Sequence, residues 1–224
     1  MALLAPAEES TLTLRLVELG DVGPTARLHA KALPGSFFVS LGPRFLRAYH
    51  RTFLTSPAGI ALLAECDGMT VGFVVGTVDE ATHYRHVVRR DRTALGVRGI
   101  ASLASRPALA GRFVRTRLLR YLRGLVRLSR RSSITCADVV HLPTAGVLSH
   151  MAVDAPHQGE GIGRILLEAF AETAKAQGAR TVRLATATDN EGARRFYERA
   201  GWQQGDERAD VDGRRWMHYS RDLR

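Results

Sequence analysis

The sequence predicts an α/β (α+β) fold in which a mixed central sheet of about six to seven strands is flanked by helices. Three observations predict it. Short apolar segments separated by turn residues fill much of the N-terminal half, which is typical of antiparallel strands. In the C-terminal half, strand-like segments alternate with helical patterns. The chain has 224 residues, and its 45% hydrophobic content is ordinary for a domain with one large core.

The first strand and helices are expected in the first quarter of the chain. Residues Thr11 to Val17 alternate like a strand, and Asp21 to Leu33 has a helical pattern with Pro24 near its opening turn. Phe37 to Leu54 predicts a further helix or helix pair, interrupted at Gly42-Pro43.

A β-hairpin is expected next. Gly59 to Cys66 and Met69 to Val78 have the pattern of two strands, and they are joined by Asp67-Gly68. This dipeptide favours the turn type that matches the twist of the flanking strands. Near the C-terminus, Arg214 to Tyr219 predicts a late edge strand.

A glycine-rich turn from Val153 to Arg164 lies between a strand and a long helix. Val147 to Val153 predicts the buried strand, and helical spacing continues after the turn until Gly178. The first N–H groups of a helix have no intrahelical partner and lie at the positive end of its dipole. Glycines at that point therefore let a phosphate approach the bare main chain.

The spacing of these glycines indicates which class of phosphate-binding loop the sequence contains. Arg164 stands where a dinucleotide-binding loop needs a third Gly or Ala, and no Lys-Ser or Lys-Thr follows as in a mononucleotide P-loop. The remaining pattern is Gln158-x-x-Gly161-x-Gly163. It resembles the pyrophosphate-binding signature of the GNAT superfamily of acetyl-CoA-dependent N-acetyltransferases, which is Gln or Arg, two residues, Gly, one residue, and Gly or Ala.

A second landmark lies downstream. Thr181 to Thr186 alternates like a strand, and Thr188 to Glu191 has the pattern of a capping box that starts another helix. Asn190 to Trp202 then runs Asn-x-x-Ala-x-x-Phe-Tyr-x-x-x-Gly-Trp, which is similar to the second landmark of the GNAT superfamily. The two landmarks occur in the right order and at a separation that fits the fold, so together they favour membership of that superfamily.

The resemblance implies acetyl-CoA as the cosubstrate and assigns residues to it. Backbone groups of Met151, Ala152 and Val153 would bind the pantetheine arm. Asn190 would meet that arm from the other side, or would only cap its own helix. The pyrophosphate would be held by the loop residues Gln158, Gly159, Glu160, Gly161, Ile162, Gly163 and Arg164.

No metal is expected. Acetyl transfer from a thioester starts with an activated acyl group and needs no metal ion. Cys66 and Cys136 lie far apart without His or Cys neighbours at metal spacing, which indicates neither a zinc site nor a disulfide framework.

Two side chains are candidates for catalysis. Tyr197 matches the tyrosine that, in the enzymes the chain resembles, donates to the CoA sulfur; the alternative is an ordinary aromatic residue on a buried helix face. His150 lies beside the acyl-binding strand and is the candidate general base, with a structural histidine as the alternative. Glu65, Asp79 and His141 are further candidates for the base, and an ordered water could also deprotonate the amine.

The stretch from Ala81 to Arg131 is unusually basic. It contains 14 arginines against one acid, Asp91, for a net charge of +13, whereas the whole chain carries +10. From Pro107 onward, apolar residues among the arginines predict a basic amphipathic helix. Three interpretations stay open: a solvated face in a chain that prefers Arg to Lys, an attractive surface for an anionic acceptor or for CoA phosphates, and a helix lying on an anionic membrane or a nucleic acid.

These patterns predict one domain and a set of partners. We expect a flexible tail at 1–10 and a single GNAT acetyltransferase domain at 11–224, with an Arg-rich, mostly helical insertion at 81–140 between the third and fourth strands. No signal peptide or membrane-spanning stretch is evident, which favours a cytoplasmic location. The expected partners are a small-molecule amine acceptor, an anionic ligand or membrane surface at the insertion, and a second copy of the chain in a homodimer. Nucleic acid is disfavoured, because the insertion has few aromatic residues.

Three functions remain in view. The first is transfer of an acetyl group from acetyl-CoA directly to a primary amine of a small molecule, such as an amino sugar or an amine metabolite, in a ternary complex. The second is acetylation of a protein N-terminus or lysine, which would need an open groove. The third is a non-catalytic CoA-binding module that docks through its basic helix.

Overall fold

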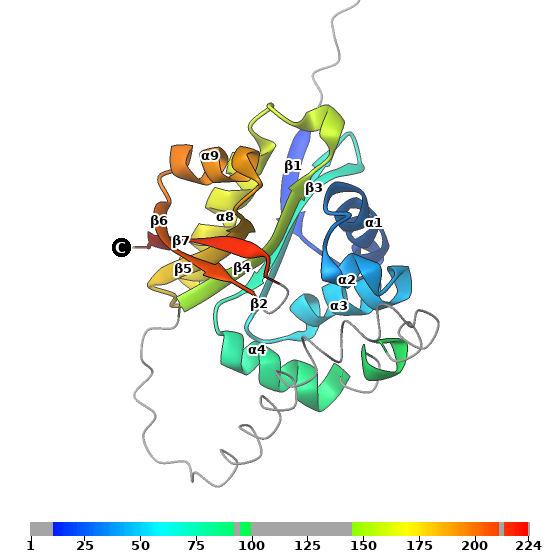
Figure 1. Ribbon diagram of the computed structural model, residues 1–224. Coiled ribbons are helices and arrows are strands. Elements are labelled where there is room, and N and C mark those ends of the chain that lie inside the picture. The colour runs from blue at the N-terminus through cyan, green and yellow to red at the C-terminus, as the bar shows by residue number, and fades with distance from the viewer. Residues whose placement is uncertain (1–10, 92–94, 100–144, 211–212, 224) are drawn as a thin grey trace, which may run out of the picture.

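The computed structural model describes residues 11–91, 95–99, 145–210 and 213–223. They contain a seven-stranded sheet with strand order β1-β2-β3-β4-β5-β7-β6, which confirms the predicted mixed sheet (Figure 1). β4 and β5 pair in parallel, and all other neighbours pair antiparallel. The strands are β1 (Leu12–Leu16), β2 (Gly59–Cys66), β3 (Met69–Thr77), β4 (Ala145–Val153), β5 (Thr181–Ala187), β6 (Gln203–Ala209) and β7 (Arg215–Asp222).

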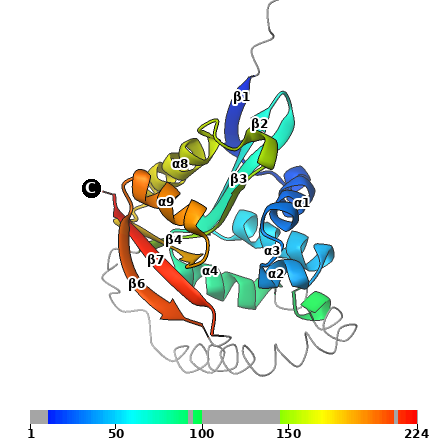
Figure 2. The same cartoon turned by 45° about the horizontal axis from the view of Figure 1, so that its top comes forward.

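Helices cover both faces of this sheet. Figures 1 and 2 show α1, α2 and α3 on one side and α8 and α9 on the other. The helices are α1 (Val22–Ala32), α2 (Phe37–Ser40), α3 (Pro43–Thr55), α4 (Glu80–His86), α8 (Ile162–Ala176) and α9 (Glu191–Arg199). The expected break at Gly42-Pro43 is confirmed, since α2 and α3 flank it and Gly42 has φ 87°.

The alternation of side chains along the central strands produces two hydrophobic clusters. Ile60, Leu62 and Val74 face α8, whereas Leu63 and Phe73 face α1 and α3. All five side chains are buried. Successive residues of a strand point to opposite faces of the sheet, and both faces of β2 and β3 are buried. Their sequences are therefore continuous apolar runs that supply side chains to both clusters.

The predicted turn between β2 and β3 is also confirmed. Asp67 has φ 50° and Gly68 has φ 75°, so both central residues adopt the left-handed conformation that the favoured two-residue hairpin requires. The expected late edge strand at Arg214 to Tyr219 is wrong in its position. β7 lies between β5 and β6, and the edge is β6, whose seven residues are all exposed and therefore lack the apolar alternation of a half-buried strand.

The start of the basic insertion is helical. Asp79 caps α4, because its Oδ1 accepts hydrogen bonds from the backbone N–H groups of Ala81 and Thr82 at 2.9 and 3.1 Å. A π-helical turn follows at Val87–Asp91, and residues 95–99 form one more short helix. The amphipathic helix expected from Pro107 lies outside the described residues. Within the described parts of the chain, no helix is long and apolar enough to cross a membrane.

A bulge in β4 decides which side chains face which core. The pairing of β3 with β4 passes from Val75↔His150 to Gly76↔Leu148, so one extra β4 residue, Ser149, sits between them. Leu148 therefore packs in the cluster under α8, while His150 turns to the α1 and α3 side. Gly76 lies opposite this bulge, and a Cβ there would stand only 2.6 Å from Phe170 Cζ of α8.

We expect Gly76→Ala to destabilise the fold. The added methyl group collides with the Phe170 ring and with the Val147 carbonyl oxygen, and relieving such overpacking in a core costs about 1–3 kcal/mol. Urea unfolding measures the loss. Gly205→Ala is the control, because its Cβ would meet nothing closer than 3.6 Å. Equal stability of the two variants would contradict the close approach of α8 to β3.

Candidate functional site

The candidate site is built on the separation of two parallel strands. β4 and β5 pair only at Ala145↔Thr181, Gly146↔Val182 and Val147↔Arg183. Beyond these pairs β4 continues alongside β3 and β5 alongside β7, so the two strands part. Within the described parts of the chain, the main chain of β4 from residue 148 to 153 therefore has no strand partner on its β5 side. A strand edge of this kind offers N–H and C=O groups to a ligand.

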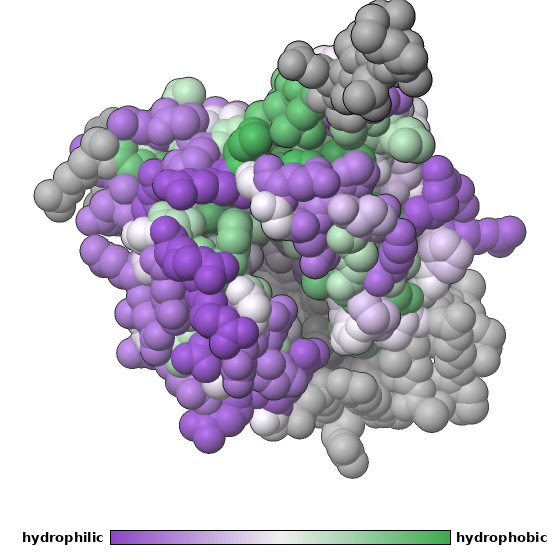
Figure 3. All heavy atoms as spheres, turned by 90° about the horizontal axis from the view of Figure 1, so that it is seen from above, coloured by the Kyte–Doolittle hydropathy of each residue, from purple (hydrophilic) through white to green (hydrophobic). Residues whose placement is uncertain are grey.

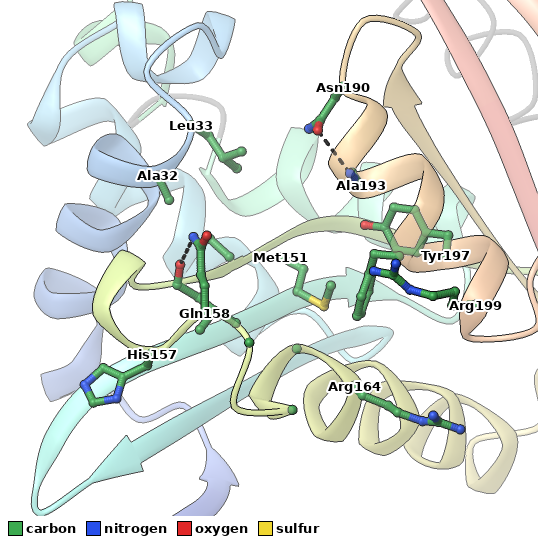
Figure 4. A pocket seen from close by; sticks show the side chains of 16 residues that line it. Ala32, Leu33, Met151, His157, Gln158, Arg164, Asn190, Ala193, Tyr197 and Arg199 are labelled. Atoms are coloured by element: carbon green, nitrogen blue, oxygen red, sulfur yellow. Dashed lines mark hydrogen bonds between the residues drawn. The ribbon is translucent and has the colours of Figure 1, made fainter.

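A cavity of about 490 Å³ lies at this separation. Seen from above, the surface is hollowed between the α9 side and the α1 side, and the wall with α9 is mostly hydrophilic (Figure 3). The cavity is lined by β4, by the loop after it, by the end of α1 and by α9 (Figure 4). The lining residues predicted from the sequence are Met151, Ala152, Val153, Gln158, Gly159, Gly161, Gly163, Arg164, Asn190 and Tyr197.

The glycine loop has the backbone that its sequence predicts. Gly159 and Gly161 have φ 94° and 85°, in the left-handed region that favours glycine. Gly161 is the N-cap of α8 and has no side chain to cap it, so the first-turn N–H groups remain available to an anion. A Cβ at Gly163 would meet Phe196 at 3.5 Å, which is ordinary contact, so the protein interior does not itself require glycine there.

Gln158 braces the loop. Its Nε2 donates to the Val153 carbonyl oxygen at 3.1 Å, the bond drawn dashed beside its label in Figure 4. Asp154 caps the short 3₁₀ turn Ala155–His157 through the Ala155 N–H, and it also pairs with Lys31 Nζ of α1 at 2.6 Å. This ion pair joins the last turn of α1 to the start of the loop.

The other predicted loop residues differ in what they offer. Glu160 is exposed and its Oε2 lies 3.1 Å from His157 Nδ1. The Ile162 side chain is buried in the core under α8, so only its backbone can serve a ligand. Arg164 is exposed and lines the cavity. It is a cation close to the site where an anion would meet the helix N-terminus.

Asn190 acts as a helix cap. Its Oδ1 accepts from the Ala193 N–H at 3.1 Å, which fits the capping interpretation of its sequence. The residue also lines the cavity. Since the oxygen is used for the cap, the amide NH₂ group is the part of the side chain that could reach a ligand.

Tyr197 is held in an aromatic cluster at the cavity wall. Its ring centroid lies 6.1 Å from Trp202 and 5.7 Å from Tyr219, and the residue is only 8% exposed. Its hydroxyl oxygen points into the cavity (Figure 4). Burial raises the pKa of Tyr197 to about 12, so at neutral pH the hydroxyl keeps its proton and acts as a hydrogen-bond donor.

His150 is half-buried and contacts a buried pair of histidines, and the sequence did not predict this grouping. His29 of α1 and His50 of α3 are completely or almost completely buried, and His29 Nδ1 lies 2.9 Å from His50 Nε2. The rings of His29 and His150 have centroids 4.5 Å apart, and His150 Nε2 lies 3.1 Å from the Tyr49 hydroxyl. We call His29, His50 and His150 the histidine cluster.

Burial keeps the histidine cluster neutral. It lowers the pKa of His29 to about 4, and together with the neighbouring His29 it lowers the pKa of His50 to about 3. Burial beside the other two rings lowers the pKa of His150 well below its usual range. His150 is not among the described residues that line the cavity; it precedes the lining residue Met151 on β4. A neutral imidazole can accept a hydrogen bond from an amine, but it is a weak acceptor of a full proton.

Six further lining residues were not assigned from the sequence. Ala32 and Leu33 come from the end of α1, His157 comes from the turn after β4, and Ala193, Phe196 and Arg199 come from α9. Of these six, Ala193 and Phe196 occupy fixed positions of a landmark pattern. Arg199 has no spacing signal, because its place at the cavity depends on how α9 is seated over β5.

The histidine cluster predicts a fall in stability on mild acidification. The unfolded chain takes up protons near pH 6.5, whereas folded His29 and His50 take them up near 4 and 3, so stability is full above pH 6.5 and is lost as the pH falls towards 4. His29 alone contributes a loss on the order of 3 kcal/mol by pH 4.

Urea unfolding at a series of pH values measures this loss. His29→Phe should reduce the slope between pH 6.5 and 5, where the carboxylates remain ionised, without abolishing it, because His50 and His150 also have lowered pKa values. His218→Gln, which alters a histidine outside the cluster, should leave the slope unchanged. A wild-type stability that stays level over this interval would refute the neutral state of the cluster.

Comparisons with known proteins agree with this geometry. Residues 124–202 match the model of the Acetyltransferase (GNAT) family. The N-alpha-acetyltransferase 30 of Schizosaccharomyces pombe is 35% identical over 72 residues, which are 31% of this chain and 48% of that protein. The match thus spans about half the length of this curated relative.

Solved structures share the fold at low sequence identity. Ard1 from Thermoplasma volcanium aligns with a TM-score of 0.56 at 17% identity, covering 94% of this chain and 97% of that chain. The ribosomal-protein-S18-alanine N-acetyltransferase from Escherichia coli aligns with a TM-score of 0.56 at 14% identity, covering 95% and 94%. Sequence match, fold and cavity agree, and the chain therefore carries a GNAT acetyltransferase domain.

Proposed function

We propose that this chain transfers an acetyl group from acetyl-CoA directly to a primary amine in a ternary complex. One observation carries the proposal. The open edge of β4, the glycine loop at the N-terminus of α8 and the hydroxyl of Tyr197 all face a single cavity. Each feature suits a different part of the same donor: a peptide-like arm, a pyrophosphate and a thioester sulfur.

The donor fits this cavity in a definite orientation. Backbone groups of Met151 and Val153 suit the amides of the pantetheine arm, because an extended ligand can pair with an open strand edge as another strand would. The loop from Gly159 to Gly163 suits the pyrophosphate, since helix N–H groups and the dipole favour negative charge. Arg164 of α8 and Arg199 of α9 add positive charge to the lining of the cavity. Acetyl-CoA supplies the activated acyl group, and the protein supplies position and proton management.

Tyr197 would act at the sulfur. The pKa of the Tyr197 hydroxyl is higher than that of a thiol, so Tyr197 does not transfer its proton completely to the thiolate. It instead donates a hydrogen bond that stabilises the negative charge on the departing sulfur. The proton balance then closes without an external acid: the neutral amine loses one proton, the thiolate gains one, and the products are an amide and a thiol.

The acceptor would approach from the side of α1 and α2. His150 and Tyr49 lie on this side of β4, and Phe38 stacks on Tyr49 with centroids 4.3 Å apart. α2 has the sequence Phe-Phe-Val-Ser and carries no charge, with its residues half-buried. These side chains favour an acceptor with an apolar body beside its amine, which is compatible with a small-molecule amine metabolite.

A protein N-terminus is the second candidate acceptor. It is favoured by the match to the N-alpha-acetyltransferase 30 of Schizosaccharomyces pombe. A panel of free amines and of short peptides with free and blocked N-termini separates the two classes. Turnover of peptides that depends on the free terminus, with none of the small amines accepted, would replace the small-molecule assignment.

Gly161→Ala should weaken acetyl-CoA binding by about tenfold or more, because a side chain at this N-cap projects into the space where the phosphate meets the helix. Calorimetric titration measures it. Gly178→Ala is a matched control: its φ of 88° is close to the 85° of Gly161 and it also projects into open space, but it lies at the far end of α8. If both variants bind like the wild type, the loop does not hold the donor.

Tyr197→Phe should lower kcat by about 10²-fold while leaving acetyl-CoA affinity nearly unchanged, as expected for loss of a hydrogen bond made mainly to the leaving group. The ring contacts with Trp202 and Tyr219 are retained in Phe. Thiol release under saturating donor measures kcat. Unchanged turnover would make Tyr197 a packing residue, and a wild type that acetylates no amine would favour a non-catalytic CoA-binding module.

A further inference from the structure

A second cavity lies on the outer side of α3 and shares no lining residue with the acetyl-transfer cavity. Its volume is about 370 Å³. Of the described residues that line it, none carries a carboxylate and four carry a guanidinium group. The lining consists of Val22, Ala48, Leu95, Arg44, Arg47, Arg51 and Arg98.

The sequence of α3 produces three of these arginines on one stripe. Arg44, Arg47 and Arg51 recur at intervals of three and four, so they project from the same face of the helix. Leu46, His50 and Phe53 project from the other face and are buried. The arginines are not needed by the core and are exposed.

The fourth arginine arrives from the basic insertion. Residues 95–99 form a short helix close to α2 and α3, drawn green in Figure 1. It packs near α3, since a Cβ on Gly99 would lie 3.6 Å from Phe45 Cε2. Leu95 and Arg98 thereby complete the cavity wall. The positive charge of the insertion and a positive stripe of the domain surface are thus combined at one place.

This arrangement has an energetic cost that an anion would remove. Guanidinium groups three and four residues apart on a helix repel each other, and a concave surface between low-dielectric walls concentrates their field. Each guanidinium presents a planar fork of donors that matches phosphate oxygens in pairs. The three guanidinium groups of α3 match the charge of a ligand with two or more phosphates better than that of a ligand with a single carboxylate.

We propose that the cavity formed by Arg44, Arg47, Arg51 and Arg98 is a binding site for an anion that carries two or more phosphate groups. Among the described residues, its lining contains no aromatic side chain on which bases could stack, which disfavours single-stranded nucleic acid. The site is independent of the acetyl donor, because the cavity lies on the outer face of α3 and the donor loop lies at α8.

Calorimetric titration with inorganic pyrophosphate in phosphate-free buffer tests the site. The cavity variant is R44Q/R47Q/R51Q, in which Gln keeps helix propensity and removes the charge. The control variant R180Q/R183Q/R208Q removes the same charge from exposed positions that line neither cavity. Circular dichroism and urea unfolding verify that both variants fold.

The wild type should bind two pyrophosphates, one at the α8 loop and one at the arginine cavity. The control variant should also bind two, while the cavity variant should lose one site or bind there about tenfold more weakly. If the loop does not bind, the wild type shows one site and the cavity variant none; the arginine site then stands although the proposed function fails. Equal binding by wild type and cavity variant overturns the inference.

Vesicles identify the source of the phosphates. Phosphatidylcholine vesicles containing cardiolipin, which carries two phosphates, are sedimented with each protein. Capture of the wild type and the control variant, but not the cavity variant, assigns the site to a lipid headgroup. Pyrophosphate binding at the cavity without vesicle capture assigns it to a free phosphate ligand. Absence of both overturns the proposal.

Discussion

The site depends on the parting of β4 and β5 after three parallel pairs. A strand with an unpaired edge inside a domain would normally cost the free energy of its unsatisfied N–H and C=O groups. Here the edge opens to a cavity, so the groups are hydrated or can be satisfied by a ligand with its own amides. The same separation provides space for α8 to present its N-terminus and for α9 to present Tyr197 to one point.

Keeping the strands apart requires rigid support on both faces. Under α8 the core is closed by Leu166 and Phe170, which are fully buried, and Gly76 lets that helix approach β3 closely. On the opposite face, Phe73 packs against His29 and His50. The bulge at Ser149 divides the chemistry between these faces, because it sends His150 towards α1 and α3 but leaves Met151 at the donor cavity.

The sequence was most informative where a local backbone requirement selects the residue. Asp67-Gly68 and the glycines at 159 and 161 adopt left-handed backbone that few other residues tolerate, so their turns were predictable. β6 was not predicted, because an exposed edge strand has no buried face to impose alternation. The seating of Arg199 at the cavity depends on tertiary packing and left no periodic signal.

The histidine cluster shows the same limit for chemistry. His150 could be placed beside the acyl-binding strand from the pattern of β4, but its neutrality depends on His29 and His50, which reach it from other parts of the chain. The sequence shows that these three histidines are present, but no spacing between them indicates that their rings are in contact. A pKa is set by burial and neighbours, and neither is visible in local spacing.

The neutral cluster bears on how an amine would lose its charge. A protonated amine bound against His150, Tyr49 and Phe38 would leave water and contact three uncharged side chains. Such desolvation lowers the pKa of an ammonium group. In the proposed reaction, the binding site itself would then favour the neutral amine that attack requires. A strong general base would be unnecessary under these conditions, and a neutral imidazole that accepts a hydrogen bond from the amine would be enough to orient the lone pair of the amine towards the acyl carbon.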